Sequence, residues 1–537
     1  MNRNTISDVL KTTLAEVDIE LDSFEVKPFP DEVWIIAYVH ESSMLTAQSI
    51  SASVEQKLRS TVASSDRPLA VMFRPKKTSV ESTVELSGGG RLAGADISQL
   101  IQLLEARSRT SDAVPSLNYM EDPRATPISV SATRHQLILG RRGVGKTALL
   151  LEAKRIAEQE GHATVWLNAH VIRNLSVENA NLILARSIID KLIQRIGSSE
   201  GSSSSALKIV AEKLKQPDAG QNLNLLIPEI NLVLRDILRP GLLSLFVFLD
   251  DFYLYPFADQ PKVLDFLAGI SRDSSAWLKI ASIEHLTRPW ESSTRIGLEI
   301  PNDATKIDLD ITLEDPEKTQ KFLESVLGSF TKAVGIKSPL SIAKTEALGR
   351  LVLASGGVPR DYLNLFAASI NVARSARTAA QQIGREDVAV AAGDLARSKK
   401  RDLEQDAAKE AAKLLTALSK LSEHVRHLGF TYFRVDIQQK SMPEYETLAL
   451  LSNLRFIHFI QTVSDQHKGG VRYESFLLDL SEYSDVRLQR RLHVLDLESG
   501  TWTLRKTGEG RKKEGLTGTQ LRDRLRQSPV VDLELLI

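Results

Sequence analysis

Apolar residues follow different spacings in successive stretches of the chain, and each spacing predicts a different element. Val33–Val39 and Leu69–Phe73 are short β-rich runs, and Thr46–Leu58 between them has helical spacing. Together they predict a small α/β domain over residues 1–77. Residues 78–134 are first Ser/Gly-rich and then polar with prolines, so they predict a linker and an extended lead-in around one helix.

From His135 onward, strand-sized apolar runs alternate with segments of helical spacing. The runs are His135–Leu139, Ala163–Leu167, Leu243–Leu249 and Leu278–Ser282. This alternation predicts a parallel sheet with helices on both faces, over residues 135–314. Within it, the segment GSSEGSSSS at 197–205 predicts a flexible insertion. Residues 315–396 have helical spacing only and predict a helical lid.

The last part of the chain, residues 397–537, begins with a long charged helix and ends in alternating runs such as Ser475–Leu480 and Trp502–Arg505. Helices followed by a short hairpin predict a winged-helix-like domain. The tail Arg505–Arg526 is locally basic, which on a wing would favour contacts with the backbone phosphates of DNA. A solvated tail without a ligand is the alternative.

Composition narrows the classes of function. The chain has 537 residues, 42% of them hydrophobic and 25% charged, as in a globular protein of several domains. Its formal net charge is zero, so any nucleic-acid surface is local. It contains no cysteine, which excludes disulfides, thiolate metal sites and cysteine nucleophiles. No apolar run approaches the ~18 residues of a membrane span, and the N-terminus lacks a signal-peptide core, so we expect a cytoplasmic protein with no membrane partner.

Phosphate-binding chemistry follows the first strand of the alternating region. The pattern G-x-x-x-x-G-K-[ST] is fitted by Gly140, Arg141, Arg142, Gly143, Val144, Gly145, Lys146 and Thr147. Its glycines let backbone N–H groups turn inward to phosphate oxygens, and the following helix adds its positive N-terminal end. Lys146 would reach the β- and γ-phosphates, and Thr147 would bind Mg²⁺. The pattern therefore predicts ATP and Mg²⁺ as cofactors, and a Gly-rich turn without a ligand is the alternative.

Two adjacent acidic residues end the apolar run Leu243–Leu249. Asp250 would hold Mg²⁺ through water, and Asp251 would orient or deprotonate the attacking water. A pair of solvated turn acids is the alternative, which the P-loop upstream disfavours. Asp251 stands where most P-loop proteins that hydrolyse ATP carry Glu, and the side chain of Asp is one methylene shorter than that of Glu. We therefore expect ATP hydrolysis to be slow.

The two motifs and their spacing resemble AAA+ ATPases, and most of all the origin-recognition/STAND-type branch. The resemblance covers residues from about 108 to 396. The second strand ends in Asn168, as it does in that branch. Ser282 occupies the sensor-1 position, where the resemblance implies a polar contact with the γ-phosphate or the attacking water. Glu284 lies close by in the sequence.

Two arginines extend this resemblance. The sequence STRIG contains Arg295 and resembles the element that supplies an arginine finger to a neighbouring subunit. Arg288 competes for that role, and an ordinary surface arginine is the alternative. The sequence GGVPRD contains Arg360 and matches the sensor-2 motif, in which the arginine points from the lid to the γ-phosphate. A simple helix cap is the alternative.

These features predict an AAA+ ATPase that uses ATP as a conformational switch. It would assemble as a homo-oligomer or as a hetero-oligomer with partner proteins, and DNA would be a further partner. By analogy of fold, the role would be regulatory, as in bacterial defence against viruses, transposition or replication control. A different class of function is a nucleotide-gated scaffold with little turnover. A third is a DNA-binding regulator whose ATPase core is mainly structural.

Overall fold

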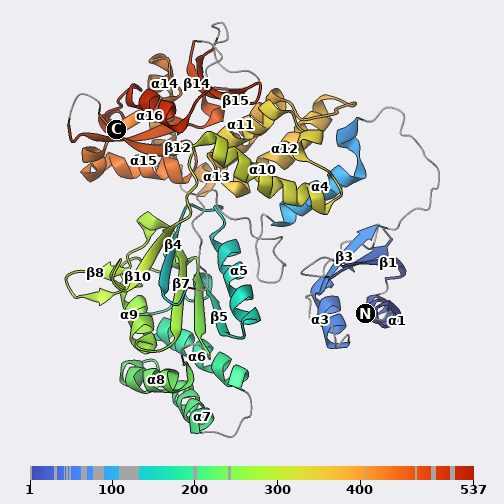
Figure 1. Cartoon of the computed structure of the whole chain (residues 1–537), viewed down its shortest axis with the longest axis vertical. Coiled ribbons are helices and arrows are strands. Elements are labelled where there is room, and N and C mark those ends of the chain that lie inside the picture. The colour runs from blue at the N-terminus through green and yellow to red at the C-terminus, as the bar shows by residue number, and fades with distance from the viewer. Residues whose placement is uncertain are drawn as a thin grey trace. The chain divides into compact units, whose positions relative to one another are not determined.

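The computed structural model divides the chain into two compact units (Figure 1). One comprises Met1–Ser87 with Thr110–Leu117, and the other Gly88–Arg109 with Asn118–Ile537. The structure describes residues 3–17, 19–28, 33–40, 43, 46–47, 50–61, 69–75, 90–107, 132–196, 202–239, 243–406, 408–465, 469–484, 491–507 and 515–536. No helix in these ranges has both the length and the apolar character needed to cross a bilayer.

The first unit contains a three-stranded mixed sheet. Its elements are α1 (Arg3–Ala15), β1 (Leu21–Pro28), β2 (Val33–Val39), α3 (Ser51–Thr61) and β3 (Leu69–Pro75). The central strand β2 pairs antiparallel with β1 and parallel with β3. Ile35 and Ala37 of β2 are buried in one core with Leu10 of α1 and Val54 of α3. The small α/β domain is therefore present, and it includes α1 and β1, which we had not predicted.

The second unit is built on a five-stranded parallel sheet in the order β10-β4-β7-β6-β5. Its strands are β4 (His135–Leu139), β5 (Ala163–Asn168), β6 (Leu245–Asp250), β7 (Ala276–Ser282) and β10 (Ala304–Asp308). The connecting helices are α5 (Lys146–Gln159), α6 (Val177–Ile196), α7 (Ser202–Lys215), α8 (Leu223–Ile237) and α9 (Gln260–Ser271). Because the strands are parallel, their carboxyl ends meet at one edge of the sheet, where a ligand site is expected.

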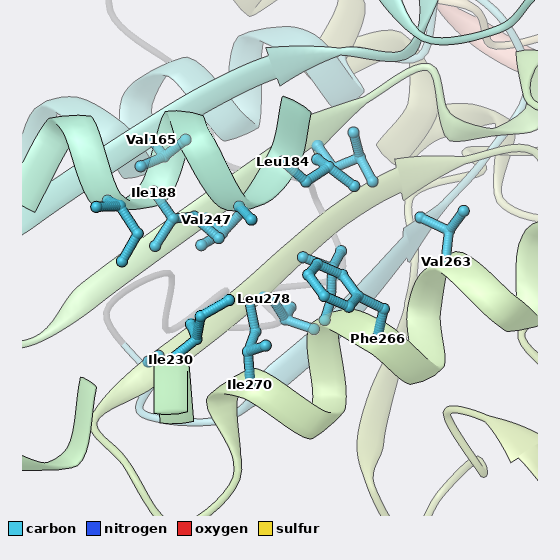
Figure 2. Packing of buried hydrophobic residues seen from close by; sticks show 14 of the residues in the cluster. Val165, Leu184, Ile188, Ile230, Val247, Val263, Phe266, Ile270 and Leu278 are labelled. Atoms are coloured by element: carbon cyan, nitrogen blue, oxygen red, sulfur yellow. The ribbon is translucent and has the colours of Figure 1, made fainter. Parts of the chain in front are cut away.

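Hydrophobic side chains cover both faces of this sheet. On one face, Val247 of β6 and Leu278 of β7 pack in a single core with Phe266 of α9 (Figure 2). On the other face, Phe248 of β6 is buried with Leu149 of α5. Successive residues of β6 thus point to opposite faces, as the pleat requires. A parallel sheet covered on both faces, with a Gly-rich loop between β4 and α5, agrees with the α/β core that the alternation of strands and helices predicts.

Four helices follow the sheet, as the spacing of residues 315–396 predicts. They are α10 (Pro316–Ala333), α11 (Thr345–Ser355), α12 (Pro359–Ala376) and α13 (Arg385–Asp406), and we refer to them as the lid helices. Helix α4 (Ala95–Arg107) packs against α10 and α12. Arg374 of α12 joins them by donating to the Leu92 carbonyl (2.7 Å) and the Ser98 hydroxyl (3.1 Å). Helix α13 continues through residue 396, so the domain boundary expected there falls inside a helix.

The C-terminal region (residues 408–536) combines helices with two small antiparallel sheets. Its elements are α14 (Ala408–His427), β11 (Tyr432–Asp436), α15 (Glu444–Asn453), β12 (Ile457–Ser464), β13 (Arg472–Leu478), β14 (His493–Glu498), β15 (Thr501–Lys506) and α16 (Gly518–Arg526). The strand order is β11-β13-β12 in one sheet, and β14 pairs with β15 in the other. The predicted helices and a hairpin are present, but the sequence pattern did not predict a second hairpin or α16. A winged-helix domain is not confirmed by this arrangement.

Two loop predictions differ from the structure. Ser202–Ser205, which we expected in a flexible insertion, belong to α7. They join this helix because Leu207, Val210 and Leu214 follow at helical spacing and are buried against the core. Residues 197–201 of the insertion, residues 78–89 of the linker and residues 108–131 of the lead-in lie outside the described residues.

The basic tail is part of the folded region where it is described. Arg505 lies in β15 and pairs with the buried Asp496 (3.0 Å). Arg522 of α16 contacts Gln461 (3.3 Å) and Glu314 (3.4 Å). The charge of Arg505 is therefore engaged within the fold, whereas the ion pair of Arg522 is open to solvent. Residues 511–513 lie outside the described residues.

Candidate nucleotide-binding site

The predicted P-loop lies at the carboxyl edge of the sheet, between β4 and α5. Gly140, Gly143 and Gly145 have positive φ values of 156°, 84° and 105°. The values at Gly143 and Gly145 lie in the left-handed region that side chains disfavour, which is why glycine is needed at both. Val144 between them is buried against Leu149 and so anchors the loop to α5.

Lys146 begins α5 and is only 6% exposed. Its ammonium group donates to the carbonyl oxygens of Gly140 (2.7 Å) and Arg141 (3.0 Å), inside the curl of the loop. Burial lowers the pKa of Lys146 to about 8, against the opposing effect of nearby carboxylates, of which Asp310 is the strongest. A buried cation inside a curl of backbone is chemically suited to bind phosphate oxygens.

Thr147 and Asp250 meet across the site, as predicted. The Thr147 hydroxyl donates to Oδ2 of Asp250 (2.8 Å), and the backbone N–H of Asp251 donates to Oδ1 (2.9 Å). Asp250 is 1% exposed, and burial together with the charge of Asp251 raises its pKa to about 6. A hydroxyl beside a buried carboxylate is a pair of hard oxygen ligands that fits Mg²⁺. Asp251 follows with a left-handed φ of 52°.

Arg141, a P-loop position in the sequence pattern, is bonded to residues outside the loop. Its backbone N–H donates to Asp310 (2.8 Å), and its guanidinium contacts the same carboxylate (3.2 Å). The guanidinium also donates to the carbonyls of Ile311 (2.9 Å) and Gly356 (3.3 Å). Arg141 therefore ties the P-loop to the segment after β10 and to the start of the GGVPRD motif. Asp310 is a site residue that sequence reasoning missed.

Arg360 lies beside the P-loop, where the sensor-2 motif predicts it. Its backbone N–H donates to the Gly143 carbonyl (3.3 Å). Burial is the main cause of the lowered pKa of Lys146, and the positive charge of Arg360 helps to lower it further. A Cβ at Gly143 would meet the Cβ of Arg360 at 2.9 Å and Val358 at 3.1 Å, so glycine allows the lid to approach closely. The side chain of Arg360 is exposed at the site.

Arg142 connects the P-loop to two further segments. Its guanidinium lies over the ring of Tyr253, 5.3 Å from the ring centre. Its carbonyl accepts a hydrogen bond from Arg455 (2.5 Å), which comes from the C-terminal region. No local signal in the sequence marks Arg455, since its partner is 313 residues away.

Ser282 and Arg295 are the two remaining candidate catalytic residues. Ser282 ends β7 beside Leu139 of β4, is fully buried, and shares a hydrogen bond with Thr287 (2.6 Å). Arg295 is exposed in the turn between β8 (Trp290–Glu291) and β9 (Ile296–Gly297), with a left-handed φ of 56°.

Three further residues that the family resemblance singles out have bonding partners in the structure. Arg288, the competing finger candidate, pairs with Glu291 (2.8 Å). Asn168 caps a short 3₁₀ turn by accepting from the N–H of His170 (2.9 Å). Glu284, expected near sensor 1, pairs with Lys306.

No protein-family profile and no curated protein matches this chain. Among solved structures it is similar to Cdc6p from Pyrobaculum aerophilum, with 15% identity, 70% of this chain and 97% of that chain covered, and a TM-score of 0.31. It is similar to Drosophila ORC bound to DNA, with 13% identity, coverage of 70% and 94%, and a TM-score of 0.28. It is also similar to the RuvB Holliday junction branch migration motor of Thermotoga maritima, with 13% identity, 53% of this chain and 66% of that chain covered, and a TM-score of 0.26. With TM-scores this low, the fold assignment rests on the sheet order and the P-loop.

Proposed function

We propose that this protein is an AAA+ ATPase that binds ATP with Mg²⁺, hydrolyses it slowly and uses it as a conformational switch. The observation that carries the proposal is the buried Lys146 inside the P-loop, next to the hydrogen-bonded pair of Thr147 and Asp250. Arg360 reaches this loop from the lid helices. A phosphate site that two structural elements share can change their relative position when the phosphate changes.

Each residue of the site has a distinct task in this proposal. The backbone N–H groups of residues 143–147 and the ammonium group of Lys146 bind the phosphates. Thr147 and Asp250 hold Mg²⁺, which neutralises phosphate charge when bound. Asp251 orients the attacking water, and Arg360 binds the γ-phosphate from the lid.

Assembly with other subunits is part of the same proposal. In this proposal Arg295, which is exposed on its hairpin, would enter the site of a neighbouring molecule and act as an arginine finger. DNA or a partner protein would be bound by the assembled form, in a regulatory role such as bacterial defence, transposition or replication control.

A second function, a nucleotide-gated scaffold with little turnover, is favoured by one observation. The hydroxyl of Ser282, which sensor 1 would offer to the γ-phosphate, is already shared with Thr287. Together with the short Asp251, this weakens the positioning of an attacking water. Nucleotide that stays intact in the protein through many hours of incubation would favour the scaffold.

The substitution Lys146→Ala tests the central proposal. Removing the ammonium group deletes a charged hydrogen-bond donor, so we expect nucleotide affinity to fall by about tenfold or more. ATP hydrolysis should fall to the background rate. Fluorescent-nucleotide titration and phosphate release measure the two quantities.

Lys154→Ala is the matched control for this test. Lys154 lies on the same helix and pairs with Glu158 (3.0 Å). This variant should bind and hydrolyse ATP as the unaltered protein does. Hydrolysis that survives Lys146→Ala at the original rate would refute the ATPase proposal.

A further inference from the structure

Arg455 joins three parts of the second unit at the P-loop. One end of its guanidinium donates to the Arg142 carbonyl (2.5 Å), and the other forms an ion pair with Asp361. The side chain of Arg455 is 13% exposed and that of Asp361 is 8% exposed. The ion pair is therefore largely shielded from water, where an arginine left without its partner is costly.

The backbone at Arg455 closes the C-terminus of helix α15. Arg455 has a left-handed φ of 65°, and the N–H of the next residue, Phe456, donates back to the Leu451 carbonyl (3.0 Å). The side chain therefore projects from the turn that ends this helix. A second contact comes from the same turn, because Asn453 lies 2.8 Å from His285, which follows the sensor-1 strand β7.

The partners of Arg455 are neighbours of the residues that would bind phosphate. Arg142 precedes Gly143, whose carbonyl accepts from the N–H of Arg360. Asp361 follows Arg360 directly. The Arg455 guanidinium thus contacts Arg142, which precedes Gly143 on the loop, and Asp361, which follows Arg360 on α12.

We propose that Arg455 is a positioning residue through which the C-terminal region sets the P-loop and Arg360 at the distance that a γ-phosphate requires. The inference rests on the proposed function. In this arrangement, a movement of the turn 453–455 changes the ATP site directly, and a change at the γ-phosphate moves the C-terminal region in return.

A specific readout follows from the position of Asp361 beside Arg360. If Arg455 only stabilised the fold, its loss would weaken ATP and ADP binding alike. If it positions Arg360, its loss weakens ATP more, because only ATP carries the γ-phosphate. We expect Arg455→Ala to lower ATP affinity by about fivefold or more and ADP affinity by less than about twofold.

The test compares three variants of the full chain. Arg455→Ala removes both contacts, whereas Arg455→Lys keeps a charge that can pair with Asp361 but lacks the two-ended fork. Arg491→Ala is the matched control, since Arg491 is an exposed arginine of the C-terminal region with a left-handed φ of 66°. Titrations with ATP and ADP are combined with hydrogen exchange of the peptides spanning residues 140–147 and 356–362, measured without nucleotide.

The proposal expects faster exchange in both peptides and a lower ATP-to-ADP affinity ratio in Arg455→Ala, a smaller change in Arg455→Lys, and neither in Arg491→Ala. An unchanged ratio, or exchange equal to that of Arg491→Ala, would overturn it. Failure of the proposed function looks different, because the unaltered protein would then bind neither nucleotide. In that case the positioning of Arg360 for a γ-phosphate is overturned together with the proposed function.

Discussion

Asp250 shows how burial adjusts one carboxylate of the site. Its two oxygens accept from Thr147 and from the Asp251 backbone, which favours the charged form. Burial and the charge of Asp251 act in the opposite direction and prevail, so its pKa rises to about 6. An exposed aspartate stays charged down to about pH 4, whereas Asp250 gains its proton as pH falls through about 6.

The raised pKa predicts a pH dependence of Mg²⁺–nucleotide binding. Protonated Asp250 cannot hold Mg²⁺ well, so affinity should fall below about pH 6, by up to about tenfold per pH unit. Asp250→Asn should bind weakly and with a flatter profile, and the comparison cancels the titration of the nucleotide itself. Titrations from pH 5 to 7.5 measure both proteins. Parallel profiles would show that Asp250 does not govern the dependence.

At the scale of elements, the loop between β4 and α5 meets the start of α12 through a backbone hydrogen bond, from the N–H of Arg360 to the Gly143 carbonyl (3.3 Å). Gly143 makes this approach possible, since any Cβ there would collide with Arg360 and Val358. The lid contact and the loop conformation are therefore fixed by the same residue.

Gly143→Ala tests that coupling. The collision and the left-handed φ together should lower the free energy of unfolding by about 2–4 kcal/mol and speed exchange of the amides at residues 358–362. Gly335→Ala is the control, because Gly335 has a φ of 83°, close to the 84° of Gly143, but has open space at its Cβ position. It should cost only about 1–2 kcal/mol and leave those amides unchanged. Denaturant unfolding and hydrogen exchange give the two quantities, and equal effects in both variants would contradict the coupling.

The elements that sequence analysis identified are those with a local signal. Strand β4 contains a continuous apolar run, helix α8 has apolar residues at 3.6-residue spacing, and the glycines of the P-loop predict a turn. Strand β10 was missed because its sequence, ATKID, is polar at every exposed position of an edge strand. Asp310 and Arg455 were missed for another reason, since their partners are 169 and 313 residues away and no short-range pattern records such contacts.

At the scale of the whole molecule, the switch proposed here depends on a second subunit. Arg295 is exposed on its hairpin, and Arg288 in the same segment is held by Glu291. A residue free to leave its own subunit is the better donor to a neighbouring site.

Mass measurement with ATP, with ADP and without nucleotide tests this arrangement. We expect a larger assembly with ATP than with ADP, and Arg295→Ala should reduce its formation by about tenfold or more, since an arginine at a phosphate contributes several hydrogen bonds. Arg288→Ala should assemble normally. Loss of assembly in Arg288→Ala alone would assign the finger to that residue, and masses that ignore nucleotide would contradict the arrangement altogether.

The long separation between Arg142 and Arg455 also has a consequence for biosynthesis. Domains fold in order as a chain leaves the ribosome, and the sheet with its P-loop is complete long before residue 455 is made. Contacts that close such long loops form late in folding. A nascent or truncated chain that ends before the turn at 453–455 would therefore lack the contact between Arg455 and the P-loop. Full nucleotide competence would then arise only when synthesis is nearly finished.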